Sequence, residues 1–447
     1  MSRAVSARPR RPNLVLIICD ALRADHLGCY GFPRSLTPNL DELARRGILF
    51  EDAVTTSPET AAAHASIMTG CYQTRHGIVE TPSAISEDVE TLAQICNTAD
   101  YETGAVVSSP VILGPDFLTG IARGFSDYTA LWPDSRRQQE LVDAADTAAL
   151  ASDWLSRQSG RPFFLWVHFV EPHGPYRVAD PALLELVRNL PRREGEPSAL
   201  PVLVDNFDPG GIPPVQVMGD NRDPVSYRAH YAARVAYVDR YVGELLRRLR
   251  SEGFGETVVA LTSDHGELLG EHDYYFQHCV TVFQPVLRVP LIISGPGVTA
   301  GRRLRSGVSH VDLMPTLLEL LGLGKPSLPA QMHGRSLLPL LRNGEDVSPV
   351  PRYAMCKLTK EWYVLLGRYK YTRGDGTSGA PGRLIDLAAD PQEEVDISGK
   401  EPTTAAKLGE LLSRFIRTAP NLLSTPPRPP DDLHDEQKRQ LEALGYL

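Results

Sequence analysis

The sequence has few cysteines, no long apolar run and no excess of positive charge. Its 447 residues contain six cysteines, none of them in a C-x-x-C pair. This distribution argues against a disulfide-stabilised scaffold and a cysteine zinc site, and it is typical of a protein from a reducing compartment. No stretch of 18 consecutive apolar residues occurs, so the sequence predicts no membrane span.

The formal net charge is −9, from 46 Lys and Arg residues against 55 Asp and Glu residues. A field of this sign repels polyanions, so nucleic acid and anionic membrane surfaces are not expected as partners. An anionic small-molecule substrate would have to meet cations placed locally. Hydrophobic residue types make up 42% of the chain, which is enough for a large core. The composition gives no indication of the oligomeric state.

Residues 1–12 form a basic N-terminal arm with four arginines. The apolar run that follows, Leu14 to Ile18, is too short for the core of a secretory signal and is soon followed by Asp20. We therefore expect a cytoplasmic protein.

Continuous runs of β-branched and aliphatic residues alternate with helical patterns along the chain. Runs without polar alternation are typical of strands buried on both faces, as in a parallel sheet covered by helices. Helices are predicted for Pro38–Arg46, with Thr37 as N-cap, for Leu141–Ser156 and for Tyr231–Leu249. The sequence thus predicts a doubly wound α/β fold with a mostly parallel central sheet flanked by helices. The predicted strands are Leu14–Ile18, Thr103–Val107, Phe163–Phe169, Thr257–Thr262 and Pro290–Ser294.

Changes in composition divide the chain. Residues 13–350 carry the α/β pattern and are expected to form the catalytic domain, within which 177–224 has the mixed composition of an insertion or lid. Short alternating strands and one helix predict an α+β subdomain with a smaller antiparallel sheet over 351–417. A Pro-rich tail, 418–447, follows. The elements expected in the subdomain are strands at Tyr353–Leu358, Trp362–Leu366, Tyr369–Thr372 and Arg383–Leu387 and a helix at Thr403–Arg417.

Polar residues that directly follow the predicted strands are the first candidates for function. In open α/β sheets, ligands bind beyond the carboxyl ends of the strands. Asp20 follows the first strand, Asp264 and His265 follow a later one, and His173 lies shortly after a third. Two carboxylates and an imidazole at one rim predict a metal site. The alternative is that the aspartates are helix caps or solvated loop residues.

A second candidate feature is the segment TTSPETAAAHASIMTG. Thr60 stands immediately before an Ala-rich stretch of good helix formers. Its hydroxyl is therefore expected at a helix N-terminus, where unpaired N–H groups and the helix dipole stabilise an anion. An N-cap threonine has the same pattern, and the local pattern alone favours the N-cap interpretation. His64 lies four residues on, on the same face of the expected helix.

Several longer segments occur along the chain, and their combination in this order is a more specific signal than any one of them alone. They are NLVLIICDALRADHLGCYG, TAAAHASIMTGCYQTRHG, FVEPHGPY, LTSDHGELLGEH, VLRVPLIISGPG and the closing LEALGYL. This series resembles the sulfatases, a branch of the alkaline phosphatase superfamily, over about residues 13–447. The first segment resembles the opening strand and metal loop of the family, the second occupies the place of its nucleophile helix, and LTSDHGELLGEH resembles its second metal motif.

The chain departs from the sulfatase pattern at the nucleophile. Sulfatases carry Cys or Ser in a C/S-x-P-S-R motif that is converted to formylglycine, and counting back from Thr69 places Thr60 at that position. Threonine cannot become formylglycine. Ala62, Ala63 and His64 replace the Pro, Ser and Arg of the conversion signal, so no formylglycine is expected.

The metal motifs depart as well. Ala21 stands where sulfatases usually present a second Asp ligand, and His265 stands where many calcium sulfatases have Asn. Together, Thr60, Asp20, Asp264 and His265 resemble the metal site of superfamily members that use a Thr nucleophile on phosphoesters, such as phosphodiesterases and phosphoethanolamine transferases. The resemblance implies one divalent metal ion held by these four residues. The imidazole ligand favours zinc or manganese over calcium, which remains an alternative.

Three histidines complete the predicted site. A metal ion beside the Thr60 hydroxyl would lower its pKa and create an alkoxide nucleophile. His64 is placed near it by helical spacing, whereas the resemblance implies anion-binding positions at His173 and His278. Each of the three is expected to bind the substrate anion or to protonate the leaving group.

Four functions remain open, and the fourth is a transferase, which is disfavoured because the transferases that the chain resembles act at membranes and no membrane anchor is predicted. The leading hypothesis is a metal-dependent hydrolase of phosphate or phosphonate esters with Thr60 as nucleophile, and with sulfate-ester hydrolysis as a weaker activity. The second is a sulfatase that uses Thr60 directly, which is disfavoured because sulfate on a threonine ester lacks the hemiacetal route that formylglycine provides. The third is a catalytically dead homologue that binds an anionic group, against which the retention of Asp20, Asp264 and His265 argues. The first two imply a small anionic ester as substrate.

Overall fold

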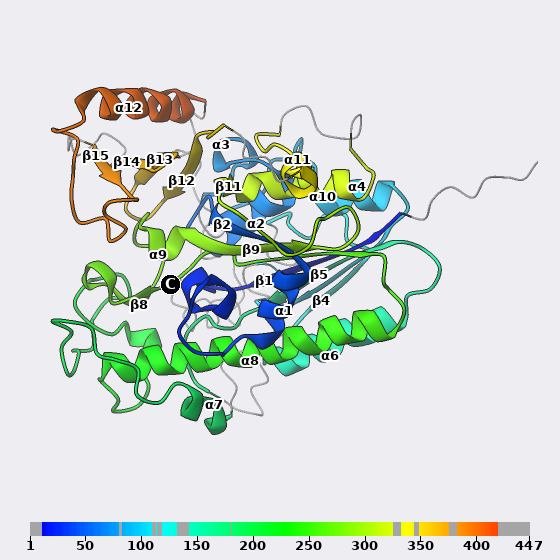
Figure 1. The fold of residues 1–447 in the computed structure, drawn as a ribbon, viewed down its shortest axis with the longest axis horizontal. Helices are drawn as coiled ribbons and strands as arrows, with labels where there is room; N and C mark the ends of the chain where they lie inside the picture. The colour runs from blue at the N-terminus through cyan, green and yellow to red at the C-terminus, as the bar shows by residue number, and fades with distance from the viewer. Residues whose placement is uncertain are drawn as a thin grey trace, which may run out of the picture.

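The computed structural model describes residues 11–79, 83–109, 113, 119–131, 143–178, 180–324, 332–343, 348–374 and 382–418. The predicted basic arm up to residue 10 and the Pro-rich tail from residue 419 lie outside these ranges. Figure 1 shows a central sheet with helices on both faces and, at one side, a smaller sheet beneath a long helix. The predicted α/β class with a small second sheet is confirmed.

The central sheet has nine strands among the described residues and is mostly parallel. Its strands lie in the order β10-β2-β9-β6-β1-β5-β3-β4, and β11 also pairs with β2. Strand β9 runs antiparallel to both of its neighbours. The strands are β1 (Asn13–Cys19), β2 (Gly47–Val54), β3 (Glu102–Val107), β4 (Asp127–Ala130), β5 (Phe163–Phe169), β6 (Thr257–Thr262), β9 (Arg288–Ser294), β10 (Arg302–Leu304) and β11 (Val308–Ser309).

All five strands predicted in this region are present, but the long strand β2 was not predicted. Its apolar run is interrupted by Glu51 and Asp52, which are only half-buried. A β-bulge between Phe50 and Ala53 shifts the register against β9 at this point. The bulge carries the two charges away from the core, so the apolar pattern is broken while the strand continues.

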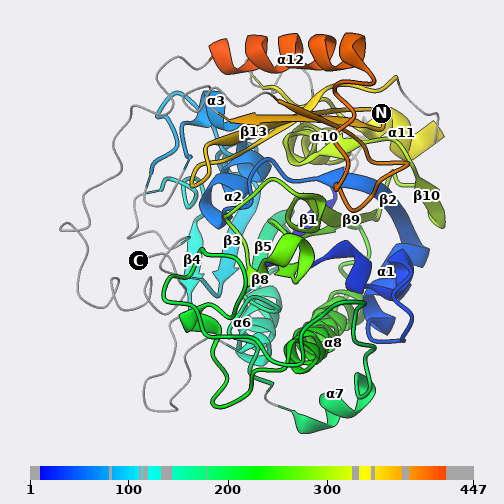
Figure 2. The ribbon, with the colours of Figure 1, turned by 90° about the vertical axis from the view of Figure 1, so that its left-hand side faces the viewer.

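Helices cover the two faces of the sheet (Figures 1 and 2). The helices on each face contribute to a separate hydrophobic cluster, one that includes α8 and one that includes α2. The first layer contains α1 (Pro38–Arg46), α6 (Ala144–Ser156), α7 (Pro181–Leu186) and α8 (Pro224–Ser251), and the second contains α2 (Thr60–Thr69), α4 (Leu92–Thr98), α10 (Leu313–Leu320) and α11 (Leu338–Asn343).

Helix α8 starts earlier than predicted, and the predicted N-cap of α1 lacks a capping hydrogen bond. Helix α8 begins at Pro224 rather than at Tyr231, because the Asp223 side chain accepts a hydrogen bond from the Val225 N–H at 3.1 Å and caps an earlier turn. Thr37 occupies the N-cap position of α1, as predicted, but it makes no capping bond to the helix.

The C-terminal subdomain is a four-stranded antiparallel sheet, as predicted. Its apolar face packs against α12, whose Leu412 is buried. The buried Arg352 side chain pairs with Asp52 of the β2 bulge at 2.7 Å, which fastens the small sheet to the large one. Its elements are β12 (Arg352–Cys356), β13 (Glu361–Leu366), β14 (Tyr369–Gly374), β15 (Arg383–Asp386) and α12 (Pro402–Arg417).

The segment 177–224, described apart from residue 179, lies along α8 at the carboxyl-end side of the sheet. Arg234 of α8 donates to the Arg177 carbonyl at 2.8 Å, and Arg228 pairs with Glu196 at 2.7 Å. Both arginine side chains are almost fully buried. Polar contacts from one helix thus hold this segment in place although its sequence shows no period.

Candidate active site

The rim of the site is formed by the carboxyl ends of the adjacent strands β6, β1 and β5. The last residues of β1 pair with Thr262 of β6 and Phe169 of β5, so the loops that follow these strands start at the same level. The Ser263 hydroxyl donates to the Cys19 carbonyl at 2.7 Å and accepts the Leu22 N–H at 2.8 Å. It thereby joins the two loops that carry the predicted aspartates.

Asp20, Asp264 and His265 converge at this rim. The His265 Nε2 atom lies 3.6 Å from Asp20 Oδ1 and 3.6 Å from Asp264 Oδ2. The His265 Nδ1 atom donates to the Gly266 carbonyl at 2.8 Å, which leaves the Nε2 lone pair facing the carboxylates. All three side chains are buried, and one donor atom from each lies within 4.8 Å of the others. The convergence expected from their positions at strand ends is therefore present.

The electrostatics of this triad fit a divalent cation. Asp20 Oδ1 and Asp264 Oδ2 are buried and have no hydrogen-bond partner among the described residues. Burial and the neighbouring Asp264 carboxylate raise the pKa of Asp20 well above its usual range. Burial also opposes ionisation of Asp264, but the imidazoles of His265 and His64 hold its pKa below the usual range. Two adjacent buried carboxylates that each keep one oxygen without a hydrogen-bond partner among the described residues are costly, and a bound cation would reduce that cost.

Thr60 lies against the same triad. It is the first residue of α2, and its Oγ1 atom lies 3.3 Å from His265 Nε2. The N-cap position is held by Glu59, so the N-cap interpretation of Thr60 is wrong. The main chain enters the helix one residue earlier than that interpretation requires, and the threonine hydroxyl points to the rim.

His64 lies one turn further along α2. Its Nδ1 atom donates to the Thr60 carbonyl at 2.8 Å and lies 3.7 Å from Asp264 Oδ2, while its Nε2 atom is buried without a hydrogen-bond partner among the described residues. The ring of His168, on β5, is centred 5.1 Å away. The His168 Nε2 atom lies 3.6 Å from Asp20 Oδ2. Sequence reasoning missed His168, for which the signal was a histidine near the carboxyl end of an otherwise apolar strand.

His173 and His278 lie together on the other side of His265. The His278 ring stacks on the His265 ring at a centroid distance of 4.4 Å, and the His173 ring meets it edge-on at 4.8 Å. His278 Nδ1 lies 3.1 Å from Glu267 Oε1, and the Tyr176 hydroxyl donates to Glu267 Oε2 at 2.8 Å. The sequence analysis missed Glu267, for which the signal was an acidic residue three positions after Asp264.

Burial keeps four imidazoles around the rim neutral, those of His64, His168, His173 and His278. Desolvation lowers the pKa of His64 and of His173 to about 3, and the pKa of His168 and of His278 to about 4. Desolvation also raises the pKa of Glu267 to about 7. Near neutral pH the histidines therefore serve as hydrogen-bonding groups or metal ligands, and they supply no positive charge to an anion.

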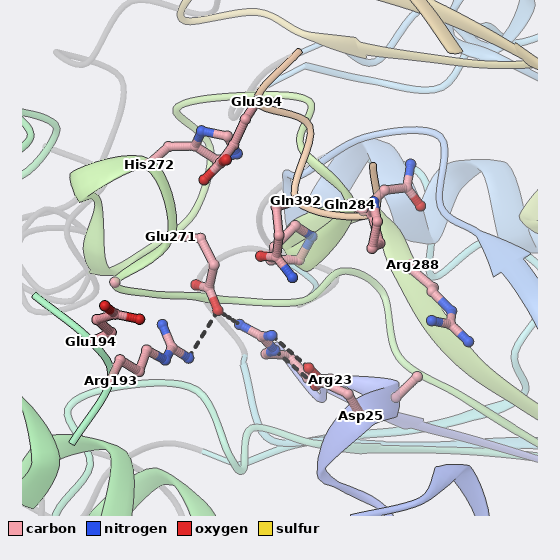
Figure 3. A pocket seen from close by; sticks show the side chains of 14 residues that line it. Arg23, Asp25, Arg193, Glu194, Glu271, His272, Gln284, Arg288, Gln392 and Glu394 are labelled. Atoms are coloured by element: carbon pink, nitrogen blue, oxygen red, sulfur yellow. Dashed lines mark hydrogen bonds and ion pairs between the residues drawn. The ribbon is translucent and has the colours of Figure 1, made fainter. Parts of the chain in front are cut away.

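A cavity of about 660 Å³ lies next to the rim. Its lining begins with Arg23, three residues after Asp20, and includes Arg193 from the segment 177–224. Figure 3 shows Glu271 between the two arginines, at 2.9 Å from Arg23 and 3.0 Å from Arg193. Arg23 also pairs with Asp25 at 2.6 Å. The charged groups named here are satisfied by one another, unlike those of the rim.

Two family models match the sequence. The model described as Sulfatase matches residues 12–323, and the model described as N-sulphoglucosamine sulphohydrolase, C-terminal, matches residues 270–417. The first of these matches contains every residue placed at the rim above.

Sequence relatives include the choline-sulfatase of Rhizobium meliloti, 29% identical over 87% of this chain and 82% of that protein. Arylsulfatase K of Xenopus laevis is 27% identical over 93% of this chain and 84% of its own length. Among solved structures, the phosphonate monoester hydrolase of Agrobacterium radiobacter has a TM-score of 0.72 and 23% identity, covering 92% of this chain and 96% of that one. The chain thus shares its fold with this hydrolase. Because the Sulfatase model matches most of the length of this chain, the chain belongs to the sulfatase family of hydrolases.

Proposed function

We propose that this chain hydrolyses phosphate or phosphonate esters, with Thr60 as nucleophile and one divalent cation as cofactor. The observation that carries the proposal is the position of the Thr60 Oγ1 atom, 3.3 Å from His265 Nε2 at the start of α2. A threonine at this position cannot be converted to formylglycine, so the hydroxyl itself is the nucleophile that the chain offers.

Asp20, Thr60, Asp264 and His265 would hold the cation. When bound, the cation would lower the pKa of an adjacent hydroxyl and neutralise charge that develops on the phosphoryl oxygens. The ligand set of carboxylates with an imidazole favours zinc or manganese over calcium.

Each side chain of the proposed site has its own role in the reaction. The Thr60 hydroxyl loses its proton to solvent, and its oxygen attacks phosphorus while the bond to the ester oxygen breaks. His278 donates its Nε2 proton to the leaving oxygen while its Nδ1 atom takes a proton from the Glu267 carboxyl, whose Oε1 atom lies 3.1 Å away. His64 and His173 are the proposed contacts to the phosphoryl group; because their Nδ1 atoms donate to the Thr60 and Gly174 carbonyls at 2.8 Å and 2.7 Å, each ring would need a second proton on Nε2 to donate to a phosphoryl oxygen. Water then cleaves the phosphothreonine ester and regenerates the hydroxyl.

The second candidate is a sulfatase that uses Thr60 directly, and the sulfatases among the sequence relatives favour it. It lacks the hemiacetal route for sulfate release, for which reason we rank it below the phosphoester hydrolase. A catalytically dead homologue is disfavoured because Asp20 and Asp264 keep buried oxygens without partners, a costly arrangement for a protein that binds no cation.

The test is a substrate panel run together with metal analysis. The purified chain, loaded with Zn²⁺ or Mn²⁺, is assayed on nitrophenyl phosphate, a phosphate diester, a phenyl phosphonate ester and nitrophenyl sulfate. Phosphate or phosphonate esters are expected to react faster than the sulfate. Faster sulfate cleavage would support the direct sulfatase, and absence of turnover on every ester would support the dead homologue.

The proposed location is the cytoplasm. All six cysteines are free, and five of them are buried, as in a chain that folds under reducing conditions. In the described part of the chain, no helix combines the length and the apolar character needed to cross a bilayer.

A further inference from the structure

Asp264 belongs to two groups of potential metal ligands. One group is the triad with Asp20 and His265 described above. The other joins Asp264 to His64 and His168, and one donor atom from each of these three residues also lies within 4.8 Å of the others. All members of the second group are fully buried.

The second group contains donor atoms that the protein does not satisfy. Both ring nitrogens of His168 are buried without a hydrogen-bond partner among the described residues, and the same is true of His64 Nε2 and Asp264 Oδ2. Buried polar atoms are almost always hydrogen-bonded, so four such atoms at one point indicate a missing ligand. Neutral imidazoles with a free lone pair and a carboxylate oxygen are suitable donors for a divalent transition metal.

The surroundings hold these donors in place. The Nδ1 atom of His64 donates to the Thr60 carbonyl at 2.8 Å, which fixes the tautomer with its lone pair on Nε2, and the same Nδ1 atom lies 3.7 Å from Asp264 Oδ2. The Trp166 ring is centred 5.5 Å from the His64 ring and 6.4 Å from the His168 ring. His168 itself is on β5, in register with Ile18 of β1 just before Asp20. The donors therefore come from a strand and a helix rather than from a flexible loop.

We propose that His64, His168 and Asp264 bind a second divalent cation and that Asp264 bridges it to the first. The proposal rests on the proposed function for the first cation and gives His64 a metal-binding role in place of direct contact with the substrate. Two cations bridged by one carboxylate lie about 4 Å apart and can clamp both the attacking and the leaving oxygen of a displaced phosphoryl group. The two carboxylates would offset half of the cation charge, and the remainder would attract a phosphate or phosphonate dianion.

The number of cations per chain tests the proposal. The full chain, loaded with Zn²⁺ and freed of excess metal, is expected to hold two cations by plasma mass spectrometry. His168→Asn and Asp20→Asn are each expected to hold one, and Asp264→Asn none. His76→Asn is the matched control, because His76 is an equally buried imidazole that contacts Ser66 at 3.0 Å outside both groups, and it should keep two. Circular dichroism confirms that each variant is folded.

The outcomes separate this inference from the proposed function. One cation in the wild type, lost in Asp20→Asn and retained in His168→Asn, would overturn the second site and leave the proposed function standing. No cation in the wild type would overturn both. The Mn²⁺-loaded chain provides an independent readout, since two Mn²⁺ ions bridged by one carboxylate give a spin-coupled EPR spectrum, whereas isolated six-line signals at two equivalents would contradict the bridge.

Discussion

The rim of the site and the neighbouring cavity each contain buried charged side chains, but only in the cavity are these, Arg23 and Glu271, joined to each other in an ion pair. In the cavity, Glu271 lies between Arg23 and Arg193. At the rim, Asp20 and Asp264 lie side by side, each with a buried oxygen that lacks a hydrogen-bond partner in the described part of the chain. The charges of a buried ion pair compensate each other. Buried carboxylate oxygens without hydrogen-bond partners destabilise the fold unless they bind a ligand.

The largest effect is expected at the nucleophile. Thr60→Ala should lower turnover by about 10³-fold or more, because it removes the attacking oxygen, while metal content and folding stay close to those of the wild type. Thr60→Ser should keep part of the activity. Steady-state kinetics, metal analysis and thermal melting are measured on both variants. Turnover by Thr60→Ala at the wild-type rate would eliminate Thr60 as nucleophile.

His278→Ala should distinguish good from poor leaving groups. Loss of a general acid costs about 10²- to 10⁴-fold in rate when the leaving alkoxide needs a proton, and much less when it is a nitrophenolate. The measurement compares kcat for alkyl and nitrophenyl esters of the same acid. His173→Ala is the control, since it removes the adjacent imidazole that lacks the contact to Glu267. Equal slowing of both ester types in His278→Ala would assign it to binding.

The paired cavity should respond in stability rather than in metal content. Glu271→Gln leaves the buried Arg23 without one of its carboxylate partners, and because Asp25 still pairs with Arg23 at 2.6 Å, the loss should stay below the roughly 3–5 kcal/mol expected for an uncompensated buried charge. Urea unfolding measures the loss, and plasma mass spectrometry is expected to find unchanged metal. Loss of metal without loss of stability would contradict this prediction, because it would assign Glu271 to metal binding rather than to folding.

The same pair predicts a pH dependence. Burial opposes ionisation of Glu271, but Arg23 and Arg193 hold the pKa of its carboxyl at about 2 in the folded chain. That pKa lies below the ordinary glutamate value near 4.3, so the stabilisation is complete above roughly pH 5 and is lost as the pH falls toward 2. The unfolding free energy of Glu271→Gln should fall less steeply than that of the wild type over this range. Parallel curves would contradict the assignment.

The smallest effect concerns metal removal. A cation that binds only the folded chain stabilises it by about 2.7 kcal/mol at 100 times its Kd, so a chelator should lower the Tm of the wild type. The Asp264→Asn variant should melt at the same temperature with and without chelator, because the rim has lost its shared ligand. An equal shift in both proteins would place the cation elsewhere.

Much of the fold could be predicted from the sequence because buried parallel strands leave continuous apolar runs. Asp20 and Asp264 could be predicted for a related reason. The end of each apolar run marks the end of a strand in the sequence, and the carboxyl ends of parallel strands meet at one rim. His168 could not be found in this way, because both faces of β5 are buried and alternation does not tell which face a residue occupies. The ion pair between Arg23 and Glu271 spans 248 residues and has no local pattern.

The Ser263 hydroxyl bonds the main chain of β1's loop to that of β6's loop, at 2.7 Å and 2.8 Å. The separation of the two loops that carry the aspartates is therefore fixed by the side chain of Ser263, which has no part in the proposed chemistry. Thr60, at the start of α2, takes no part in the two hydrogen bonds of this tie, so we expect its exchange to leave the two aspartates in place. Ser263 is the position at which a substitution would move both aspartate-bearing loops relative to each other.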